Sequence, residues 1–153
     1  MIQYKIATSE DIAELMRIRL EMLREVNLLS KDYIFSEDFC SYSRDYFLNG
    51  KHSTILAIDG ENENAIGCAT LCYLELMPTF SHPTGKRAHL MNVYTNPKYR
   101  RQGIARHMLT TLIDEAECRG VTEISLDATA SGRPLYRKLG FRDSEECMVL
   151  TLD

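Results

Sequence analysis

Apolar and polar residues alternate in some segments of the chain and follow helical spacing in others. Alternation from Ile2 to Ala7 predicts a strand, because successive side chains of a strand point to opposite faces. Apolar residues recur every three or four positions from Ile12 to Val26, which predicts an amphipathic helix capped by Thr8 or Ser9. Ser36 is placed to cap a second, aromatic-rich helix.

Strands and helices follow one another in the rest of the chain, with turn residues between them. The pattern predicts strands at 54–59, 65–75, 88–95, 123–128 and 147–152, and helices at about 103–118 and 134–139. Each of these helices is followed by a glycine, Gly120 or Gly140, as helix C-termini often are. The order predicts one α/β (α+β) domain over residues 1–153, with no linker and no internal repeat.

Composition and length are typical of one folded domain. The 153 residues are 44% hydrophobic and 26% charged, which is enough apolar material for a core. No apolar run reaches the roughly 18–20 residues of a membrane span, and the N-terminus lacks the pattern of a secretion signal. The five cysteines, an odd number without paired spacing, indicate free thiols. We therefore expect a cytoplasmic protein with no membrane partner.

Charge is distributed unevenly along the chain. There are 18 Lys and Arg against 22 Asp and Glu, yet no acidic residue lies between Leu76 and Ile113. Six basic residues in that stretch leave 12 basic and 22 acidic residues, a charge of −10, for the rest. A basic stretch inside an acidic protein indicates a local anion site. It argues against nucleic-acid binding, which usually comes with a basic domain.

A strand, a basic loop and a helix follow one another from Val93 to Cys118. Free N–H groups at a helix N-terminus bind phosphate, and small residues such as Gly103 and Ala105 let the backbone approach it closely. The segment matches neither the P-loop nor the G-x-G-x-x-G motif of dinucleotide-binding proteins. It therefore predicts a phosphate site of another kind at the start of this helix.

Two motifs in this order resemble those of the GNAT N-acetyltransferases. The family signature R/Q-x-x-G-x-G/A matches Arg100-Arg101-Gln102-Gly103-Ile104-Ala105, and its lead-in V-x-P-x-Y is similar to Thr95-Asn96-Pro97-Lys98-Tyr99. The closing element L-Y-x-K-x-G-F resembles Pro134 to Phe141. The resemblance covers roughly 88–141. It implies a single GNAT-like domain with a mixed, mostly antiparallel sheet, splayed between the fourth and fifth strands and flanked by helices.

The resemblance also implies acetyl-CoA as donor, coenzyme A as product and no metal. The diphosphate would lie on the backbone amides of 101–105, and the pantetheine arm would lie along strand 93–95. The splay would leave strand 123–128 outside the usual ladder. Many members carry Asn near the start of the last helix, where this chain has Ser131. The expected cofactor-binding residues are Val93, Tyr94, Thr95, Arg100, Arg101, Gln102, Gly103, Ile104, Ala105, Arg106, Ser131 and Tyr136.

Acetyl transfer to an amine needs a proton acceptor, a donor to the oxyanion and a partner for the departing thiolate. Tyr136 matches the family's tyrosine at the thiolate. A phenol of pKa about 10 gains little by full proton transfer to a thiolate of pKa about 8.5, so a hydrogen bond describes this role better. The alternative is a tyrosine that only packs against the sheet. A strand N–H near Val93 or Tyr94 suits the oxyanion.

The sequence leaves the identity of the base open. Some GNAT members carry Glu or His six residues before the position of Thr95, where this chain has His89. An imidazole of pKa about 6.5 suits proton removal at neutral pH. Strand alternation predicts His89, Met91 and Val93 on one face, from which His89 either reaches the cleft or meets only solvent or a neighbouring carbonyl. Glu75, Asp127 and water are the other candidates.

The leading hypothesis is an N-acetyltransferase that moves an acetyl group from acetyl-CoA to a primary amine by direct attack in a ternary complex. The acceptor, a small molecule or a peptide, stays open. Acidic residues between 32 and 45 fit either a cationic amine or a solvated acidic face. The alternative is a non-catalytic GNAT-fold module that binds or senses acyl-CoA. Cysteine and histidine spacing offers no metal ligand set. A homodimer formed through the final strand is compatible with the sequence.

Overall fold

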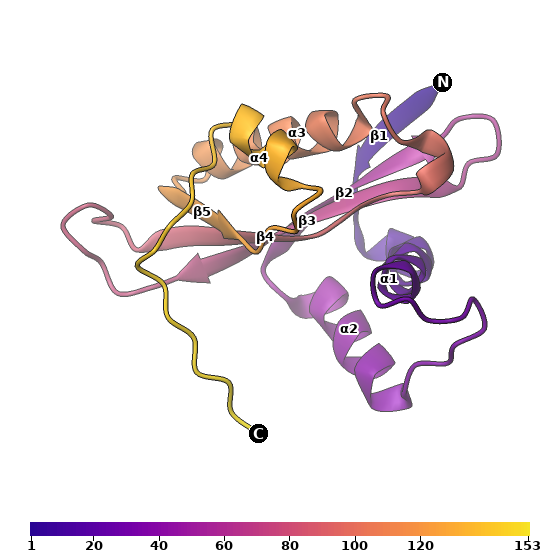
Figure 1. Ribbon diagram of the computed structural model, residues 1–153, viewed down its shortest axis with the longest axis horizontal. Coiled ribbons are helices and arrows are strands. Elements are labelled where there is room, and N and C mark those ends of the chain that lie inside the picture. Colours follow the sequence, from indigo (N-terminus) through magenta and orange to yellow (C-terminus); the bar gives the residue numbers. More distant parts are fainter.

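Five strands form one sheet in which each strand lies beside its neighbour in sequence (Figure 1). The computed structural model describes residues 1–153. Its elements are β1 (Ile2–Ile6), η1 (Ser9–Asp11), α1 (Ile12–Val26), α2 (Glu37–Asn49), β2 (His52–Asp59), β3 (Ala65–Glu75), β4 (Lys86–Thr95), η2 (Pro97–Tyr99), α3 (Ile104–Cys118), β5 (Glu123–Leu126) and α4 (Arg133–Lys138). The first four strands pair antiparallel, and β4 pairs with β5 in parallel. The predicted mixed, mostly antiparallel α/β fold is confirmed.

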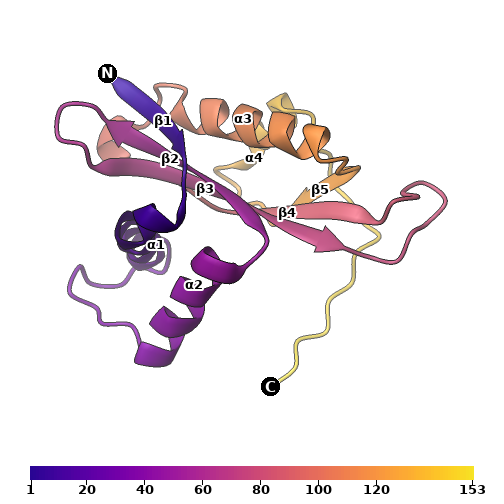
Figure 2. The ribbon, with the colours of Figure 1, turned by 180° about the vertical axis from the view of Figure 1, so that it is seen from behind.

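Helices cover both faces of the sheet. Figures 1 and 2 show α3 and α4 on one face and α1 and α2 on the other. The larger core lies between the sheet and α3, where Met108, Leu109 and Leu112 are completely buried. A smaller core joins the sheet to α1 through residues such as Ile18 and Leu56. No helix combines the length and the apolar composition that crossing a membrane requires.

Part of the sheet face that carries α1 is polar. Thr54, Thr70 and Asn92 are all buried there. The hydroxyl oxygens of Thr54 and Thr70 are 2.8 Å apart, and Asn92 Nδ2 donates to Thr70 Oγ1 over 3.1 Å. Buried polar groups are tolerated when they satisfy one another in this way. The α1 face therefore holds a hydrogen-bonded polar strip beside its small apolar core.

Ser36 caps α2 as the sequence predicts, whereas Thr8 caps the short 3-10 helix η1 that precedes α1, and α1 itself begins after Asp11 without a side-chain cap. Thr8 accepts a hydrogen bond from the N–H of Glu10, and the Asp11 carboxylate accepts one from the N–H of Thr8. Ser36 accepts one from the N–H of Phe39 at the start of α2. These side chains satisfy N–H groups that the helices cannot satisfy themselves. The ends of the strands differ from the prediction by up to two residues. For example, β2 and β4 each begin two residues earlier than expected.

The sheet opens between β4 and β5. Residues 87–90 of β4 pair with residues 123–126 of β5, and β4 then continues to Thr95 without β5 beside it. The predicted splay is confirmed. The expectation that strand 123–128 lies outside the ladder is wrong, because β5 is paired along its whole length and ends at Leu126. The opening therefore lies only beyond the pair of Leu90 with Leu126.

The predicted final strand over Cys147–Leu152 is wrong. These residues adopt no regular structure, and the tail runs away from the sheet (Figure 1). Met148, Val149 and Leu150 are more than four-fifths exposed. An apolar segment becomes a strand only when another strand supplies its ladder hydrogen bonds, and no strand pairs with this segment. The outer edge of β5 consequently stays unpaired.

Candidate functional site

The loop between β4 and α3 presents a row of free backbone donors. The N–H groups of residues 101–106 form no hydrogen bond within the chain. Arg101 and Gly103 both have positive φ, 64° and 77°, so the backbone changes direction twice before α3 begins. A Cβ on Gly103 would meet no atom of the chain within 4 Å. Successive free N–H groups at a helix N-terminus form an anion site, and here the space beside them is open.

Basic side chains around this loop differ in what they contact. Arg100 is already engaged, because its Nε donates to the carbonyl of Thr95 over 2.8 Å and its Nη2 lies 3.0 Å from the Glu25 carboxylate. It therefore fastens the loop to β4 and α1. Lys98, Arg101 and Arg106 form no ion pair, so their charges remain available to an anion at the loop.

Beside this loop, the end of β4 carries a hydroxyl group without a partner. Thr95 Oγ1 is buried and makes no hydrogen bond. Nearly all buried hydroxyl groups are hydrogen-bonded, so an orphan next to an anion-binding loop indicates a missing ligand. The β5-facing edge of residues 91–95 is likewise unpaired. A ligand with amide groups can pair with such an edge as an added strand would.

A bulge interrupts β4 at the point where the sheet opens. Thr70 lies opposite Met91 and Cys68 lies opposite Tyr94, so β4 has one residue more than β3 in this stretch. Asn92 takes up the extra residue with φ of 60°, a conformation that asparagine tolerates better than most residues. The bulge directs both Met91 and Asn92 to the α1 face.

The prediction that His89 and Val93 share one face is wrong for this reason. His89 lies between Ala88 and Leu90, both of which belong to the core under α3, so it points to the α1 face. Val93 follows the extra residue and packs against the core under α3. Simple alternation holds only while the register is unbroken.

Three side chains hold the bulge in place. Cys68 Sγ donates to the carbonyl of Asn92 over 3.2 Å, and burial raises the pKa of the Cys68 thiol to about 12, which keeps it protonated. Thr70 accepts from Asn92 Nδ2, and Arg19 Nη1 donates to Asn92 Oδ1 over 3.1 Å. The conformation of the bulge is therefore fixed from β3 and from α1.

His89 contacts two polar residues of the β5 segment. Its Nδ1 is 2.8 Å from Ser125 Oγ, and its Nε2 is 3.7 Å from a carboxylate oxygen of Asp127. The His89 side chain is 29% exposed, whereas Asp127 is fully exposed just beyond the end of β5. His89 thus lies one residue before Leu90, where the sheet opens. Ser125 orients its ring, a role that the sequence did not indicate. Of the other candidate bases, Asp127 lies near His89, but Glu75 does not.

Tyr136 lies on α4, on the other side of the opening from α1. It packs against the core under α3, and its ring meets that of Phe141 edge-on at 5.9 Å between centroids. Burial raises its pKa, so the phenol keeps its proton at neutral pH. Thr129, rather than Ser131, receives the N–H of Gly132 at the start of α4. Ser131 is exposed, with its Oγ 3.2 Å from that of Thr129.

Tyr94 contributes to the site through its backbone only. Its side chain is buried on the α1 side, where its hydroxyl donates to the Glu21 carboxylate over 3.0 Å. Burial, together with the hydrogen bond to Glu21, raises the pKa of this phenol well above its usual value. The side chain therefore anchors β4 to α1. Asn96 Nδ2 donates to the same Glu21 carboxylate and so connects the loop to α1.

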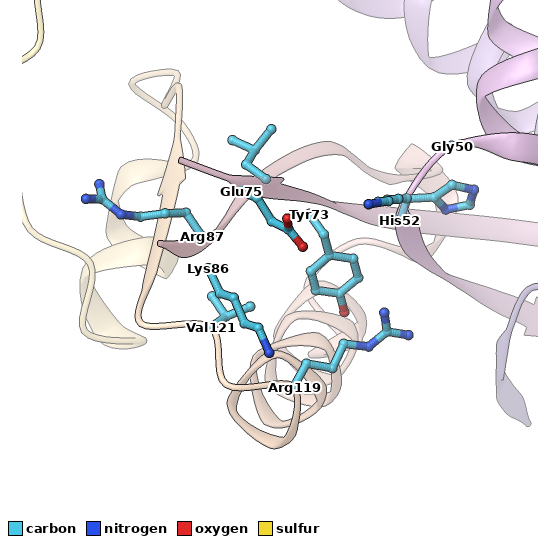
Figure 3. A pocket seen from close by; sticks show the side chains of 10 residues that line it. Gly50, His52, Tyr73, Glu75, Lys86, Arg87, Arg119 and Val121 are labelled. Carbon is cyan, nitrogen blue, oxygen red and sulfur yellow. The ribbon is translucent and has the colours of Figure 1, made fainter. Parts of the chain in front are cut away.

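A pocket of about 390 Å³ lies at the opposite end of β4 from the loop. Figure 3 shows the side chains of Tyr73, Lys86 and Arg119 converging there, while Arg87 points away. Glu75 lines this pocket, opposite Lys86 in the sheet. Lys86 lies four residues before Leu90, where the opening begins, roughly 13 Å at the usual rise. Glu75 is therefore remote from the opening between β4 and β5.

Comparison with known proteins decides the family. The acetyltransferase (GNAT) family matches residues 20–141 of the chain. The chain belongs to the GNAT family. The matched range contains the loop, the bulge at Asn92 and α4.

Two curated GNAT proteins are similar to parts of this chain. A glucosamine 6-phosphate N-acetyltransferase of Trypanosoma brucei brucei is 30% identical over 87 residues, which are 57% of each protein. A [ribosomal protein bS18]-alanine N-acetyltransferase of Escherichia coli K12 is 43% identical over 60 residues, 37% of this chain and 40% of that protein. The aligned part is thus about half of each curated relative.

Solved structures are similar over the whole chain. A predicted acetyltransferase of Clostridium acetobutylicum, solved with acetyl-CoA, is 30% identical, covers 99% of this chain and 96% of its own, and superposes with a TM-score of 0.84. A GCN5-related N-acetyltransferase of Ralstonia eutropha, at 22% identity and a TM-score of 0.80, covers 99% of both chains and shares the fold. The GNAT fold therefore extends from one end of this chain to the other.

Proposed function

We propose that this protein is an N-acetyltransferase that moves an acetyl group from acetyl-CoA to a primary amine in a ternary complex. The observation that carries the proposal is the row of free N–H groups at 101–106, shaped by Gly103 and adjoining the unpaired edge of β4. The related Clostridium acetobutylicum protein was solved with acetyl-CoA, which supports the same ligand here. The curated relatives carry the names of acetyltransferases with amine-bearing acceptors.

Residues of this chain fit the parts of acetyl-CoA one by one. The N–H groups of 101–106 and the uncommitted charges of Lys98, Arg101 and Arg106 suit the diphosphate. The unpaired edge of β4 suits the amides of the pantetheine arm, and the orphan Thr95 Oγ1 offers it a further hydrogen bond. When bound, acetyl-CoA supplies an activated thioester. The protein then has to position an amine beside it, remove a proton and stabilise charge.

Tyr136 acts as a hydrogen-bond donor to the sulfur that leaves. Because burial raises the pKa of this phenol, its proton stays in place at neutral pH and is available for donation. A backbone N–H near Val93, on the β4 edge freed by the splay, serves the developing oxyanion. Core packing around Tyr136 and Val93, and the hydrogen bond from Cys68 to the bulge, support these two roles.

His89 removes the proton from the amine, directly or through water. It faces the α1 side, lies one residue before the opening, and is oriented by Ser125 at 2.8 Å. Asp127, with a carboxylate oxygen 3.7 Å from Nε2, is an acidic group near this nitrogen. Glu75 lies at the far pocket and takes no part.

Titration calorimetry tests the cofactor first. Acetyl-CoA should bind with micromolar affinity, ATP should bind weakly, and Gly103→Glu should abolish binding, because a carboxylate would stand among the phosphate donors. Absence of acetyl-CoA binding by the unmodified protein would end the proposal.

Amine-dependent release of coenzyme A thiol then tests catalysis. Tyr136→Phe should lower turnover more than tenfold and leave acetyl-CoA affinity nearly unchanged, because the hydroxyl acts on the leaving sulfur. If acetyl-CoA binds and no amine releases thiol, the protein is a module that binds acyl-CoA without turnover.

A further inference from the structure

A basic residue interrupts the apolar face of α1. Leu15, Met16, Ile18 and Met22 are buried on the side of this helix that faces the sheet. Arg19 follows Leu15 by four positions and precedes Met22 by three, so helical geometry puts it on that same side. Arg19 is partly buried there, in a position where an arginine is usually accompanied by an acidic group.

No acidic side chain accompanies Arg19. Its one hydrogen bond within the chain goes from Nη1 to the amide oxygen of Asn92, a neutral partner. Arg17, two residues earlier, instead lies 2.7 Å from the carboxylate of Glu14 and 3.3 Å from that of Glu21. Burial lowers the pKa of the Arg19 guanidinium, as expected for a cation without a counter-ion. A neutral donor could make the hydrogen bond to Asn92 at a lower desolvation cost, so holding the bulge does not by itself explain a positive charge at this position.

The surroundings of Arg19 are polar and carry no negative charge. The buried thiol of Cys68, the hydroxyl of Thr70 and the amide of Asn92 lie at this end of the side chain. His89 lies on the same face of the sheet, opposite Cys72, which is two residues along β3 from Thr70. Asn92, which Arg19 contacts, follows His89 by three residues along β4, roughly 10 Å at the usual rise, a separation that one small acceptor molecule can bridge.

We propose that Arg19 binds an oxyanion, a carboxylate or a phosphate, that the acceptor amine carries. The inference rests on the acetyltransferase function proposed above. The Nε and Nη2 edge of the guanidinium donates no hydrogen bond within the chain, and this edge matches the two oxygens of a carboxylate or phosphate. The oxyanion of the acceptor supplies the missing counter-ion. Its amine then points toward His89 and the opening between β4 and β5.

Matched pairs of amines test this on the protein loaded with coenzyme A. The probes are leucine against leucinamide, and glucosamine 6-phosphate against glucosamine, because the members of each pair differ only in the anionic group. In at least one pair the anionic member should bind at least tenfold more tightly by calorimetry. The pair that shows the preference distinguishes a carboxylate from a phosphate.

Variants on α1 then assign the preference to one residue. Arg19→Gln should remove the preference for the anionic probe and leave acetyl-CoA affinity as in the unmodified protein. Arg19→Lys should keep part of that preference. Arg17→Gln is the matched control, because Arg17 lies on the same helix with its charge already paired, and it should keep the whole preference.

Three results would overturn the inference. They are equal affinity within both pairs, a preference that survives Arg19→Gln, and no binding of any probe to the coenzyme A complex. In each case intact acetyl-CoA binding leaves the proposed cofactor function standing. Loss of acetyl-CoA binding in the unmodified protein would instead refute the proposed function, and the role of Arg19 with it.

Discussion

Replacing Gly103 by alanine separates the strain of the loop from its role in binding. Gly103 has φ of 77°, and a Cβ there meets no atom within 4 Å, so the only structural cost is the left-handed backbone. That conformation costs a residue with a Cβ about 1 kcal/mol or slightly more. For a domain of this size the melting temperature should fall by about 3 °C.

The effect on the ligand should be larger than the effect on folding. The added methyl group stands in the open space beside the free N–H groups of 101–106, where phosphate oxygens would approach to about 3 Å. Loss of one charge-assisted hydrogen bond costs about 1.5–3 kcal/mol. The Kd for acetyl-CoA should therefore rise by roughly ten- to a hundredfold, since 1.4 kcal/mol is a factor of about ten.

Gly120→Ala is the matched control at the other end of α3. Gly120 has φ of 80°, and its nearest neighbour for a Cβ is the flexible Lys86 side chain at 3.8 Å. The Gly120→Ala variant should lose as much stability as Gly103→Ala but bind acetyl-CoA as tightly as the unmodified protein does. Thermal unfolding and titration calorimetry on both variants give the two numbers. An acetyl-CoA Kd within twofold of the unmodified protein for Gly103→Ala would refute the phosphate site at this loop.

Three further predictions follow from packing, charge and proton transfer. Leu112→Ala, at a completely buried position, should cost about 2–5 kcal/mol in urea unfolding, whereas Leu150→Ala in the exposed tail should cost less than about 0.5 kcal/mol. Hydrogen bonds from Arg137 and Arg133 lower the pKa of Asp143, so Asp143→Asn should destabilise at pH 7. The difference should disappear as the pH falls from about 4 through the lower folded-state pKa. His89→Gln should remove the acidic limb of the kcat/KM profile against pH, and an unchanged profile would exclude His89 as the base.

The features that local chemistry determines could be predicted from the sequence. The spacing of apolar residues and the two flanking glycines located α3 to within a residue, because helix periodicity and helix ends depend on neighbours in sequence. The free N–H groups at 101–106 follow from the same local geometry. The shape of the sheet, and its opening beyond Leu90, came from the resemblance to a known family and not from periodicity.

The features that depend on a partner elsewhere in the chain could not be predicted. The bulge at Asn92 reverses the faces of β4, and one extra residue leaves no mark on an alternating pattern. Cys147–Leu152 has the composition of a strand, but composition does not supply a neighbour for its backbone. Arg19 is visible as a break in an apolar face. Spacing alone does not say whether such an arginine finds a carboxylate or only the amide of Asn92.

The hydrogen bonds of the polar strip on the α1 face all run in one direction, from donor to acceptor. Arg19 can only donate and the carbonyl of Phe47 can only accept, so the hydrogen bonds between them must run one way, through Asn92, Thr70, Thr54 and His52. His52 therefore carries its proton on Nε2, toward the Phe47 carbonyl, and its bare Nδ1 receives the hydroxyl proton of Thr54.

A second proton on His52 would turn Nδ1 into a donor and force the Thr54 hydroxyl to face Thr70 instead. The hydroxyl proton of Thr70, next to the bulge, would then lose its acceptor. Protonation of His52 would in this way change the hydrogen bonding of Thr70 on β3, beside the bulge at Asn92.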